Sequence, residues 1–361
     1  MLSVSGEYGI VNQIEFQGRS FAGESVAEYH VVETNDIVYT KSPLKANPYG
    51  IIKVNNGAPG IVSTLYAVYH PCEGTVAEYI DYYFGNDLRL NKYLKPLVNI
   101  GAKHDMKVNN ETVLTGEVYF PGYSEQKKIV GFLTILDERI RQQRNLVEAL
   151  KKYKRGVMQK VFRNMSAFSP SGFETVRLSD IFKKASRRNS NGEIKNVITN
   201  SAEHGLIPQR DFFDKDIAVD GNTGNYYVIE YGDFVYNPRK SNTAPYGPFN
   251  RYERQEKGII SPLYTCLVLK TDIEPAYLAW YFKSDAWYRY IYDNGSQGVR
   301  HDRVSMTDDL LMGIPVIIPS KDSQIKIAKL LDCLEKRFQV ELSQCEYLKT
   351  VREALLQQLF I

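Results

Sequence analysis

Residues 124–162 read SEQKKIVGFLTILDERIRQQRNLVEALKKYKRGVMQKVF, and this stretch decides the fold. Its apolar residues recur at alternating intervals of four and three, which is the pattern of a coiled-coil seam. No proline interrupts the stretch, and Pro121 followed by Ser124 and Glu125 is typical of a helix start. The sequence therefore predicts one long coiled-coil helix within residues 121–163.

The same apolar pattern returns in residues 322–360, with each position 198 residues after its partner. A single amphipathic helix cannot keep its apolar stripe out of water, so we expect the two helices to pack on each other. The residues of the predicted coiled-coil interface are Ile129, Leu133, Leu136, Ile140, Leu150, Ile327, Leu331, Leu334, Phe338 and Leu348.

The rest of the chain repeats as well, with a period of about 197 residues. The sequence DIVY at residues 36–39 recurs as DFVY at 233–236, and PYG at 48–50 recurs as PYG at 245–247. Two related halves predict a pseudo-two-fold axis, which makes the long helices antiparallel and places one globule at each end of a dumbbell. Such a molecule is suited to gripping a partner such as duplex DNA at two separated places.

Each globule is predicted to mix strands and helices. Runs such as residues 51–54 and 66–69 are rich in β-branched and aromatic residues and lie among glycine, proline and asparagine, which is typical of strands and turns. The fold class is therefore α+β, with two repeated α/β domains separated by two long helices that form an antiparallel coiled coil. We divide the chain into a first globule (1–120), a central helix (121–163), a linker (164–174), a second globule (175–318) and a C-terminal helix (319–361).

The first globule lacks one segment of the repeat. Met1 aligns with Val197, so residues 172–196 of the second half have no counterpart in the first. The segment includes a basic cluster made of Lys183, Lys184, Arg187 and Arg188. Two explanations remain open: the start codon lies inside a once-longer gene, or another chain supplies the segment.

Composition indicates an ordinary soluble protein. The chain has 361 residues, of which 43% are hydrophobic and 24% are charged, and its N-terminus shows no signal-peptide pattern. We therefore expect a cytoplasmic location and no membrane contact. The four cysteines form no CxxC pair, so we expect reduced core thiols and no metal site. The net charge of +3 is too small to indicate a nucleic-acid partner by itself.

No catalytic motif is recognisable. The chain has no glycine-rich phosphate loop, HExxH motif or GxSxG elbow. The His-Asp pairs in residues 103–105 and 300–303 have no identifiable serine or cysteine partner, so we predict no catalytic residue. Such a loop is better suited to reading groove edges, because arginine can bind guanine and aspartate can accept from cytosine.

Basic, amide and aromatic side chains interleave in residues 237–254, and residues 41–56 form the equivalent loop of the first half. Loops of this kind can contact both phosphates and bases, although an ordinary polar loop remains the alternative. The candidate DNA-binding residues are Lys41, Lys45, Lys53, Lys103, His104, Lys183, Lys184, Arg187, Arg188, Asn237, Arg239, Lys240, Tyr246, Arg251, Arg254, Arg300, His301 and Arg303.

The chain resembles the specificity (S) subunits of type I restriction-modification systems over its whole length. The pattern Pro-x-x-x-x-Gln-x-x-Ile opens both helices, at residues 121–129 and 319–327, and a Leu-Lys pair recurs at 150–151 and 348–349. Together with the repeat, these motifs are similar to those of the family. The two globules would then be target-recognition domains, the first of them incomplete at its N-terminus.

The resemblance implies a non-catalytic subunit. Each target-recognition domain would read one half of a bipartite, asymmetric DNA site, and the helices would fix the spacer between the halves. Methyltransferase (M) subunits, two of them, would methylate adenine, and restriction (R) subunits would complete the nuclease. This chain would hold no cofactor, because S-adenosylmethionine, ATP and Mg²⁺ belong to those partners. The alternative function is a scaffold that joins two protein-binding modules without DNA.

Overall fold

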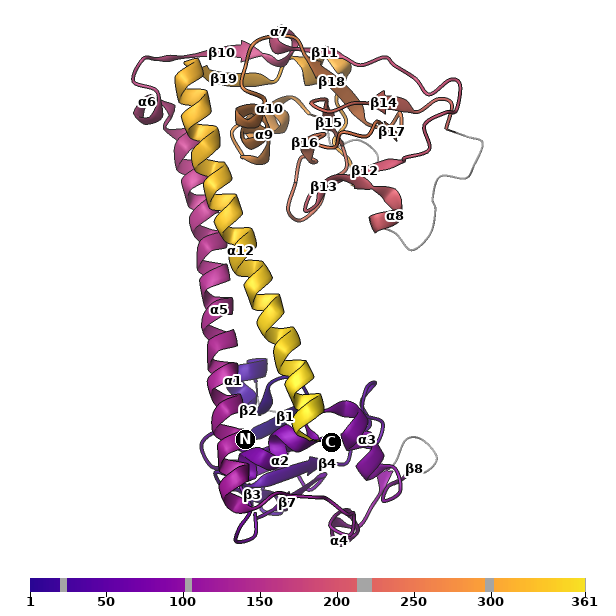
Figure 1. Ribbon diagram of the computed structural model, residues 1–361, viewed down its shortest axis with the longest axis vertical. Helices are drawn as coiled ribbons and strands as arrows, with labels where there is room; N and C mark the ends of the chain where they lie inside the picture. The colour runs from indigo at the N-terminus through magenta and orange to yellow at the C-terminus, as the bar shows by residue number, and fades with distance from the viewer. Residues whose placement is uncertain (20–24, 101–105, 213–222, 296–301, 361) are drawn as a thin grey trace. The chain divides into compact units, whose positions relative to one another are not determined.

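The computed structural model describes residues 1–19, 25–100, 106–212, 223–295 and 302–360 (Figure 1). The chain forms two compact units, described one at a time below: unit 1 comprises Met1–Leu146 and Glu341–Ile361, and unit 2 comprises Val147–Val340. Two long helices, α5 (Tyr123–Arg163) and α12 (Lys321–Leu359), each contribute one part to either unit. The predicted fold class, a mixture of strands and helices with two long helices, is confirmed.

Unit 1 contains small antiparallel sheets covered by short helices. A three-stranded sheet has the order β5-β4-β7. Two further strand pairs, the hairpin β1-β2 and the pair β3-β6, lie beside it. The strands are β1 (Leu2–Ser5), β2 (Gly9–Asn12), β3 (His30–Val32), β4 (Ile37–Thr40), β5 (Ile52–Val54), β6 (Gly60–Val62), β7 (Tyr66–Tyr69), β8 (Asn99–Ile100) and β9 (Met106–Lys107). The short helices are α1 (Gln13–Gln17), α2 (Ala77–Phe84), α3 (Asp87–Leu94) and α4 (Asn110–Val113).

Unit 2 repeats this plan with one more strand in the main sheet, whose order is β11-β18-β15-β16. The strands are β10 (Phe173–Arg177), β11 (Phe182–Lys184), β12 (Ile198–Ser201), β13 (Gly205–Pro208), β14 (Tyr227–Ile229), β15 (Phe234–Tyr236), β16 (Phe249–Arg251), β17 (Gly258–Ile260), β18 (Thr265–Leu269) and β19 (Pro315–Pro319). The short helices are α6 (Met165–Phe168), α7 (Leu178–Ile181), α8 (Gln209–Phe212), α9 (Pro275–Lys283), α10 (Tyr288–Asn294) and α11 (Asp308–Met312).

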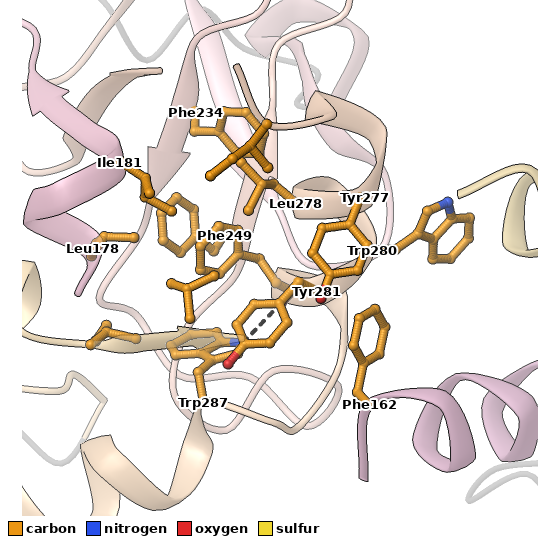
Figure 2. Packing of buried hydrophobic residues seen from close by; sticks show 14 of the residues in the cluster. Phe162, Leu178, Ile181, Phe234, Phe249, Tyr277, Leu278, Trp280, Tyr281 and Trp287 are labelled. Atoms are coloured by element: carbon orange, nitrogen blue, oxygen red, sulfur yellow. Dashed lines mark hydrogen bonds between the residues drawn. The ribbon is translucent and has the colours of Figure 1, made fainter. Parts of the chain in front are cut away.

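The core of unit 2 is strongly aromatic. Figure 2 shows the rings contributed by β15, β16, α9 and the segment before α10 packed around one another, with Leu178 and Ile181 of α7 turned toward them. Phe249 stacks on Phe282 with the ring centroids 3.9 Å apart. Because large rings bury much apolar surface in fixed orientations, this cluster holds the sheet and the helices together.

The repeat in the sequence is also a repeat of contacts. In unit 1, Phe360, which directly follows α12, packs against Tyr79 of α2 with the ring centroids 5.1 Å apart. In unit 2 the equivalent Phe162 of α5 packs against Tyr277 and Tyr281 of α9, with centroids 5.8 and 5.5 Å apart (Figure 2). The last turn of one long helix is therefore inserted beside the short aromatic helix in each unit.

A buried glutamine fixes the start of each long helix. In unit 1, Gln126 accepts a hydrogen bond from the Val76 N–H at 2.9 Å and donates to the Pro121 carbonyl. In unit 2, Gln324 accepts from the Glu274 N–H at 2.8 Å and donates to the Pro319 carbonyl. Each side chain thus ties the helix start to the segment leading into α2 or α9.

The long helices pack antiparallel within each unit. In unit 1, Arg352 of α12 pairs with Asp137 of α5, and in unit 2, Lys154 of α5 pairs with Glu335 of α12 at 2.5 Å. All ten residues of the predicted interface are buried or half-buried: Ile129, Leu133, Leu136, Ile140 and Leu348 in unit 1, and Leu150, Ile327, Leu331, Leu334 and Phe338 in unit 2.

Two sequence-based expectations need correction or refinement. The expectation of four core cysteines is wrong for Cys72 and Cys333, which are exposed, whereas Cys266 and Cys345 are buried. Cys333 is exposed because it lies on α12 outside the apolar stripe that includes Leu331. The predicted linker contains the helical turn α6, whose Met165 is buried in the core of unit 2.

No helix within the described ranges is long and apolar enough to cross a membrane.

Candidate nucleic-acid interface

A loop of fixed shape follows β15 and carries several of the predicted DNA-binding residues. Its two ends are joined by a hydrogen bond from the Tyr236 hydroxyl to the Tyr246 carbonyl at 2.8 Å. Gly247 closes the loop with a φ of 85°, and a Cβ there would lie 1.9 Å from the Asn237 carbonyl oxygen. Only glycine fits this close approach, so residues 237–246 leave and re-enter the sheet at set positions.

Arg239 and Arg303 are brought side by side by backbone pairing. The Lys240 N–H donates to the Asp302 carbonyl and the Val304 N–H donates to the Pro238 carbonyl, both at 2.9 Å. Arg239 is exposed, whereas the Arg303 side chain is 25% exposed, and its buried Nε makes no hydrogen bond but lies 3.6 Å from the Asp302 carboxylate. An exposed guanidinium beside a second, partly buried one is suited to an anionic or acceptor-rich ligand.

Three buried asparagines support this loop from below. Asn237 donates to the Asn200 carbonyl at 3.2 Å, and Asn250 donates to the Asn200 side-chain oxygen at 2.7 Å. Asn200 donates in turn to the Val235 carbonyl at 2.8 Å. Asn237 is only 6% exposed, so its amide holds the loop in place and its side chain lies largely out of reach of a ligand.

A cleft of about 640 Å³ gathers the predicted residues Asn237, Arg239 and Arg303. Residues that the sequence analysis did not single out line it as well: Gln209, Tyr226 and Tyr264. Guanidinium, amide and phenol groups together can donate to phosphates, pair with base edges and stack on bases. Tyr226 and Tyr264 belong to no recognisable motif, so no sequence pattern pointed to them.

Arg251 and Arg254 line a second cleft, of about 550 Å³, which shares Ala202, Glu203 and Thr243 with the first. The Arg251 guanidinium lies over the Tyr231 ring, 5.2 Å from its centroid, and its Nε is also buried without an acceptor. Arg254 is exposed. The clefts therefore adjoin each other, and the predicted arginines are divided between them.

Lys154 and Glu335 of the long helices close the second cleft on another side. Burial alone would raise the pKa of Glu335, but hydrogen bonds from Gln339 and Lys154 lower it below its ordinary value. This carboxylate therefore stays charged and paired with Lys154. The pair gives the cleft a fixed polar wall.

The basic cluster at residues 183–188 is mostly engaged within unit 2. Lys184 pairs with Asp308 at 2.5 Å, and Arg187 pairs with Glu230 at 2.5 Å and with the buried Asp233 at 2.6 Å. The remaining two differ: Lys183 is exposed, and Arg188 donates to the Asn225 carbonyl and lies over the Tyr227 ring. Arg187 therefore has a structural role in this unit.

The other predicted residues of unit 2 are less accessible. Tyr246 is half-buried against Tyr288, with the ring centroids 5.0 Å apart. Lys240 is half-buried, and its backbone takes part in the pairing with Asp302. These two residues shape the loop, and Arg239 is the most exposed cation that the loop presents.

In unit 1, Lys41 is half-buried and Lys45 is exposed on the loop after β4. Lys53 of β5 lies instead in an acidic cavity of about 550 Å³ together with Asp81, Asp137 and Arg352. Burial raises the pKa of Asp81, while Lys53 and the hydrogen bond from the Val54 N–H oppose that shift. Lys53 therefore partly offsets the cost of the charge on the half-buried Asp81. Lys103, His104, Arg300 and His301 lie outside the described residues.

Among the described residues, no group of histidine, cysteine, aspartate or glutamate side chains is placed to hold a metal ion. Arginine, amide and aromatic side chains line the clefts, together with the carboxylates of Glu203, Glu253 and Glu335. Such a mixture is suited to binding a polar, charged ligand.

Three solved structures are similar to this chain. The HsdS subunit from Thermoanaerobacter tengcongensis shares 17% identity, with coverage of 93% of this chain and 83% of that chain and a TM-score of 0.50. A structure describing complex assembly and conformational transition of the type I R-M system shares 17% identity, with coverage of 93% and 84% and a TM-score of 0.54. The type I restriction-modification S subunit from M. genitalium shares 13% identity, with coverage of 91% and 84% and a TM-score of 0.51.

No protein-family model and no curated protein matches the sequence. At identities of 13–17% the structural likeness concerns the fold. It extends over more than nine-tenths of the chain and therefore includes both halves and both long helices. The chain has the fold of type I restriction-modification S subunits, and the resemblance expected from the repeat and the helix motifs is confirmed at that level.

Proposed function

We propose that this protein is the DNA-binding specificity subunit of a type I restriction-modification complex. Each half would read one part of a bipartite, asymmetric site, and partner subunits would methylate adenine or cut the DNA. The observation that carries the proposal is the fold shared with HsdS subunits over 93% of the chain. The adjoining clefts of unit 2 support it, because they concentrate arginines beside aromatic and amide groups.

Within unit 2, the two arginine-lined clefts would contact DNA in different ways. Arg239 is exposed at the end of a rigid loop and can approach a guanine edge with both of its terminal nitrogens. Arg303 lies deeper, beside the carboxylate of Asp302 at 3.6 Å, and would support that contact. Arg254, exposed in the neighbouring cleft, is placed to bind phosphate.

The chemistry would belong to the partners. We propose that M subunits, two per complex, bring S-adenosylmethionine and that R subunits bring ATP and Mg²⁺. The fold match to a structure concerned with type I R-M complex assembly supports partners of this kind. The protein itself would hold no cofactor.

The test uses the full chain assembled with methyltransferase subunits. DNA duplexes that the complex binds are selected from a random pool, and the adenines that it methylates are then mapped to give the recognised motif. Arg239→Ala should lower specific affinity by about 1–3 kcal/mol and relax one position of the methylated motif, since a bidentate base contact is lost. Arg254→Ala should weaken all sequences alike and reduce the salt dependence of binding.

Arg289→Ala is the matched control, because this arginine is exposed in unit 2 and lines neither cleft. It should leave affinity and motif unchanged. If the assembled wild-type chain selects no duplex, the protein-scaffold function is favoured. If it selects a motif that Arg239→Ala leaves unrelaxed at wild-type affinity, the cleft is not the reading surface.

A further inference from the structure

The two halves differ at one edge of the main sheet. In unit 2, β18 is paired on one side with β15 and on the other with β11, and β19 is paired with β10 over five residues. In the described part of unit 1, the equivalent strand β7 is paired with β4 alone, and residues 117–121, equivalent to β19, form no strand. Unit 1 therefore presents an open sheet edge, which is a template for pairing with another strand.

Apolar side chains are exposed beside this edge. Tyr119 and Phe120 are 81% and 38% exposed, whereas Ile318, the equivalent of Phe120, is 8% exposed. Leu114 is 63% exposed, whereas the equivalent Met312 packs against the core of unit 2. We define the open edge as β7 together with Leu114 and residues 117–121.

Unit 2 shows what covers such an edge. Helix α7, between β10 and β11, inserts Leu178 and Ile181 into the aromatic core, where they are 0% and 3% exposed (Figure 2). The Leu178 N–H also donates to the Ile314 carbonyl at 2.8 Å. The cover is therefore a strand, a helical turn and a second strand, attached by both backbone pairing and apolar contact.

A buried carboxylate marks the same place in both units. Asp233 accepts from the Glu230 N–H at 2.9 Å and pairs with Arg187, which follows β11. The equivalent Asp36 accepts from the Glu33 N–H at 2.7 Å, but its side-chain partner is His70 at 2.6 Å. The His70 side chain is 75% exposed, so it can move aside, and Asp36 is positioned to receive an arginine from a covering segment.

We propose that the open edge of unit 1 is a docking site for a polypeptide segment with the chemistry of residues 173–187. That segment would add a strand beside β7 and another along residues 117–121. Apolar residues equivalent to Leu178 and Ile181 would lie between them, and an arginine would pair with Asp36. The proposal rests on the two edges and is independent of the proposed DNA-binding function.

A second copy of this chain does not fit as the occupant. Its own residues 173–187 already cover the edge of its unit 2, where Leu178 and Phe182 are 0% and 1% exposed. Lending them to a neighbour would open one edge in order to close another, so the exchange would gain no buried surface. A segment of this pattern that is not already engaged in another edge gains that surface in full.

The direct test titrates a fluorescent peptide with the sequence of residues 172–189 against the full chain. Hydrogen exchange at saturating peptide should show new protection at residues 66–69 and 117–121, with no change at 265–269. A Leu178→Asp/Ile181→Asp peptide and the chain variant Asp36→Asn should each bind at least about tenfold more weakly, since they lose apolar burial and a charge-assisted pair respectively.

Asp233→Asn in the chain is the matched control, because that carboxylate is already paired within unit 2, and it should leave peptide binding unchanged. A second variant carries residues 172–196 joined in front of Met1, where tethering raises the effective concentration of the segment. The proposal is overturned if the tethered segment gives no protection at 66–69 and 117–121. It is also overturned if the tether protects but the free peptide does not bind, or if the doubly substituted peptide binds as well as the original.

Discussion

The two halves are alike where they meet the long helices and differ at the far edge of the sheet. Gln126 and Gln324 make equivalent pairs of hydrogen bonds, and Phe360 and Phe162 contact equivalent tyrosines. By contrast, β18 has two partner strands and β7 has one in the described part of unit 1. The helix-docking side therefore tolerates little change, because it combines buried amides with close-packed rings, whereas the edge can be built in more than one way.

The largest expected effect comes from charges placed in the helix seam. Leu133 and Leu331 are both 0% exposed, so Leu133→Asp and Leu331→Asp should each cost more than about 4 kcal/mol through an unpaired buried carboxylate. Both tryptophans, Trp280 and Trp287, lie in unit 2. Urea unfolding followed by tryptophan fluorescence should therefore report Leu331→Asp, while far-UV circular dichroism reports both variants.

Ile135→Asp and Leu330→Asp are the controls, because these side chains lie on the same two helices but are 73% and 41% exposed. Each should change the free energy of unfolding by less than about 1 kcal/mol. If Leu133→Asp shifts the fluorescence transition as far as the circular dichroism transition, the two units unfold together and cannot be compared as separate structures.

The buried glutamines give a sharper comparison of the two helix starts. Gln126→Ala and Gln324→Ala should each cost about 1–3 kcal/mol, because the N–H groups of Val76 and Glu274 lose their acceptors. Thermal unfolding of the two variants should give similar losses. Gln142→Ala, at an exposed glutamine that bonds to Glu138 on its own helix, should have little effect. A loss confined to one of the buried glutamines would show that the helix starts are not equivalent.

The smallest effect concerns a difference between the halves. Asp81 is a half-buried carboxyl in unit 1, whereas Ala279 occupies the equivalent position in unit 2. Because burial raises the folded-state pKa of Asp81 above its ordinary value, the ionised form destabilises the fold at neutral pH. The free energy of unfolding should therefore rise as the pH falls through that raised pKa toward about 3.9, the ordinary value for aspartate.

Asp81→Asn should remove this dependence and stabilise the protein at pH 7 by up to about 1 kcal/mol, with the gain disappearing as the pH falls. Urea unfolding at a series of pH values measures it. Glu73→Gln, at an exposed carboxyl of unit 1, should leave the pH dependence intact. A variant less stable than wild type at pH 7 would mean that pairing with Lys53 outweighs the burial of the charge.

Periodicity and repetition made much of the fold predictable. The four-and-three spacing gave α5 and α12 to within about one residue at each end, because a seam must stay on one face of a helix. The aromatic residues of 276–282 are likewise spaced three and four apart, as the helix α9 requires. What repeats in the sequence, such as Gln126 and Gln324, repeats in space.

The candidate clefts were less predictable, since they depend on contacts between distant residues. Residue type alone made Arg187 and Asn237 look like DNA contacts, but Arg187 meets Asp233 across 46 residues and Asn237 is buried beside Asn200. Tyr226 and Tyr264, both half-buried, were missed because tyrosine is frequent in this chain, which has 26 of them. Loop geometry decides which polar groups reach solvent, and a linear pattern does not encode it.

The tyrosine–glycine closure of the loop after β15 has a consequence for how the sequence of that loop can vary. Unit 1 has the same closure: the Tyr39 hydroxyl donates to the Tyr49 carbonyl at 2.8 Å, and Gly50 makes the same close approach to the Thr40 carbonyl. Between these fixed ends, the two loops read TKSPLKANP and NPRKSNTAP. The closure therefore holds the two ends of each loop independently of the residues between them. Substitutions inside the loop can change its exposed side chains while the ends stay in place, so a new surface can arise without a new fold.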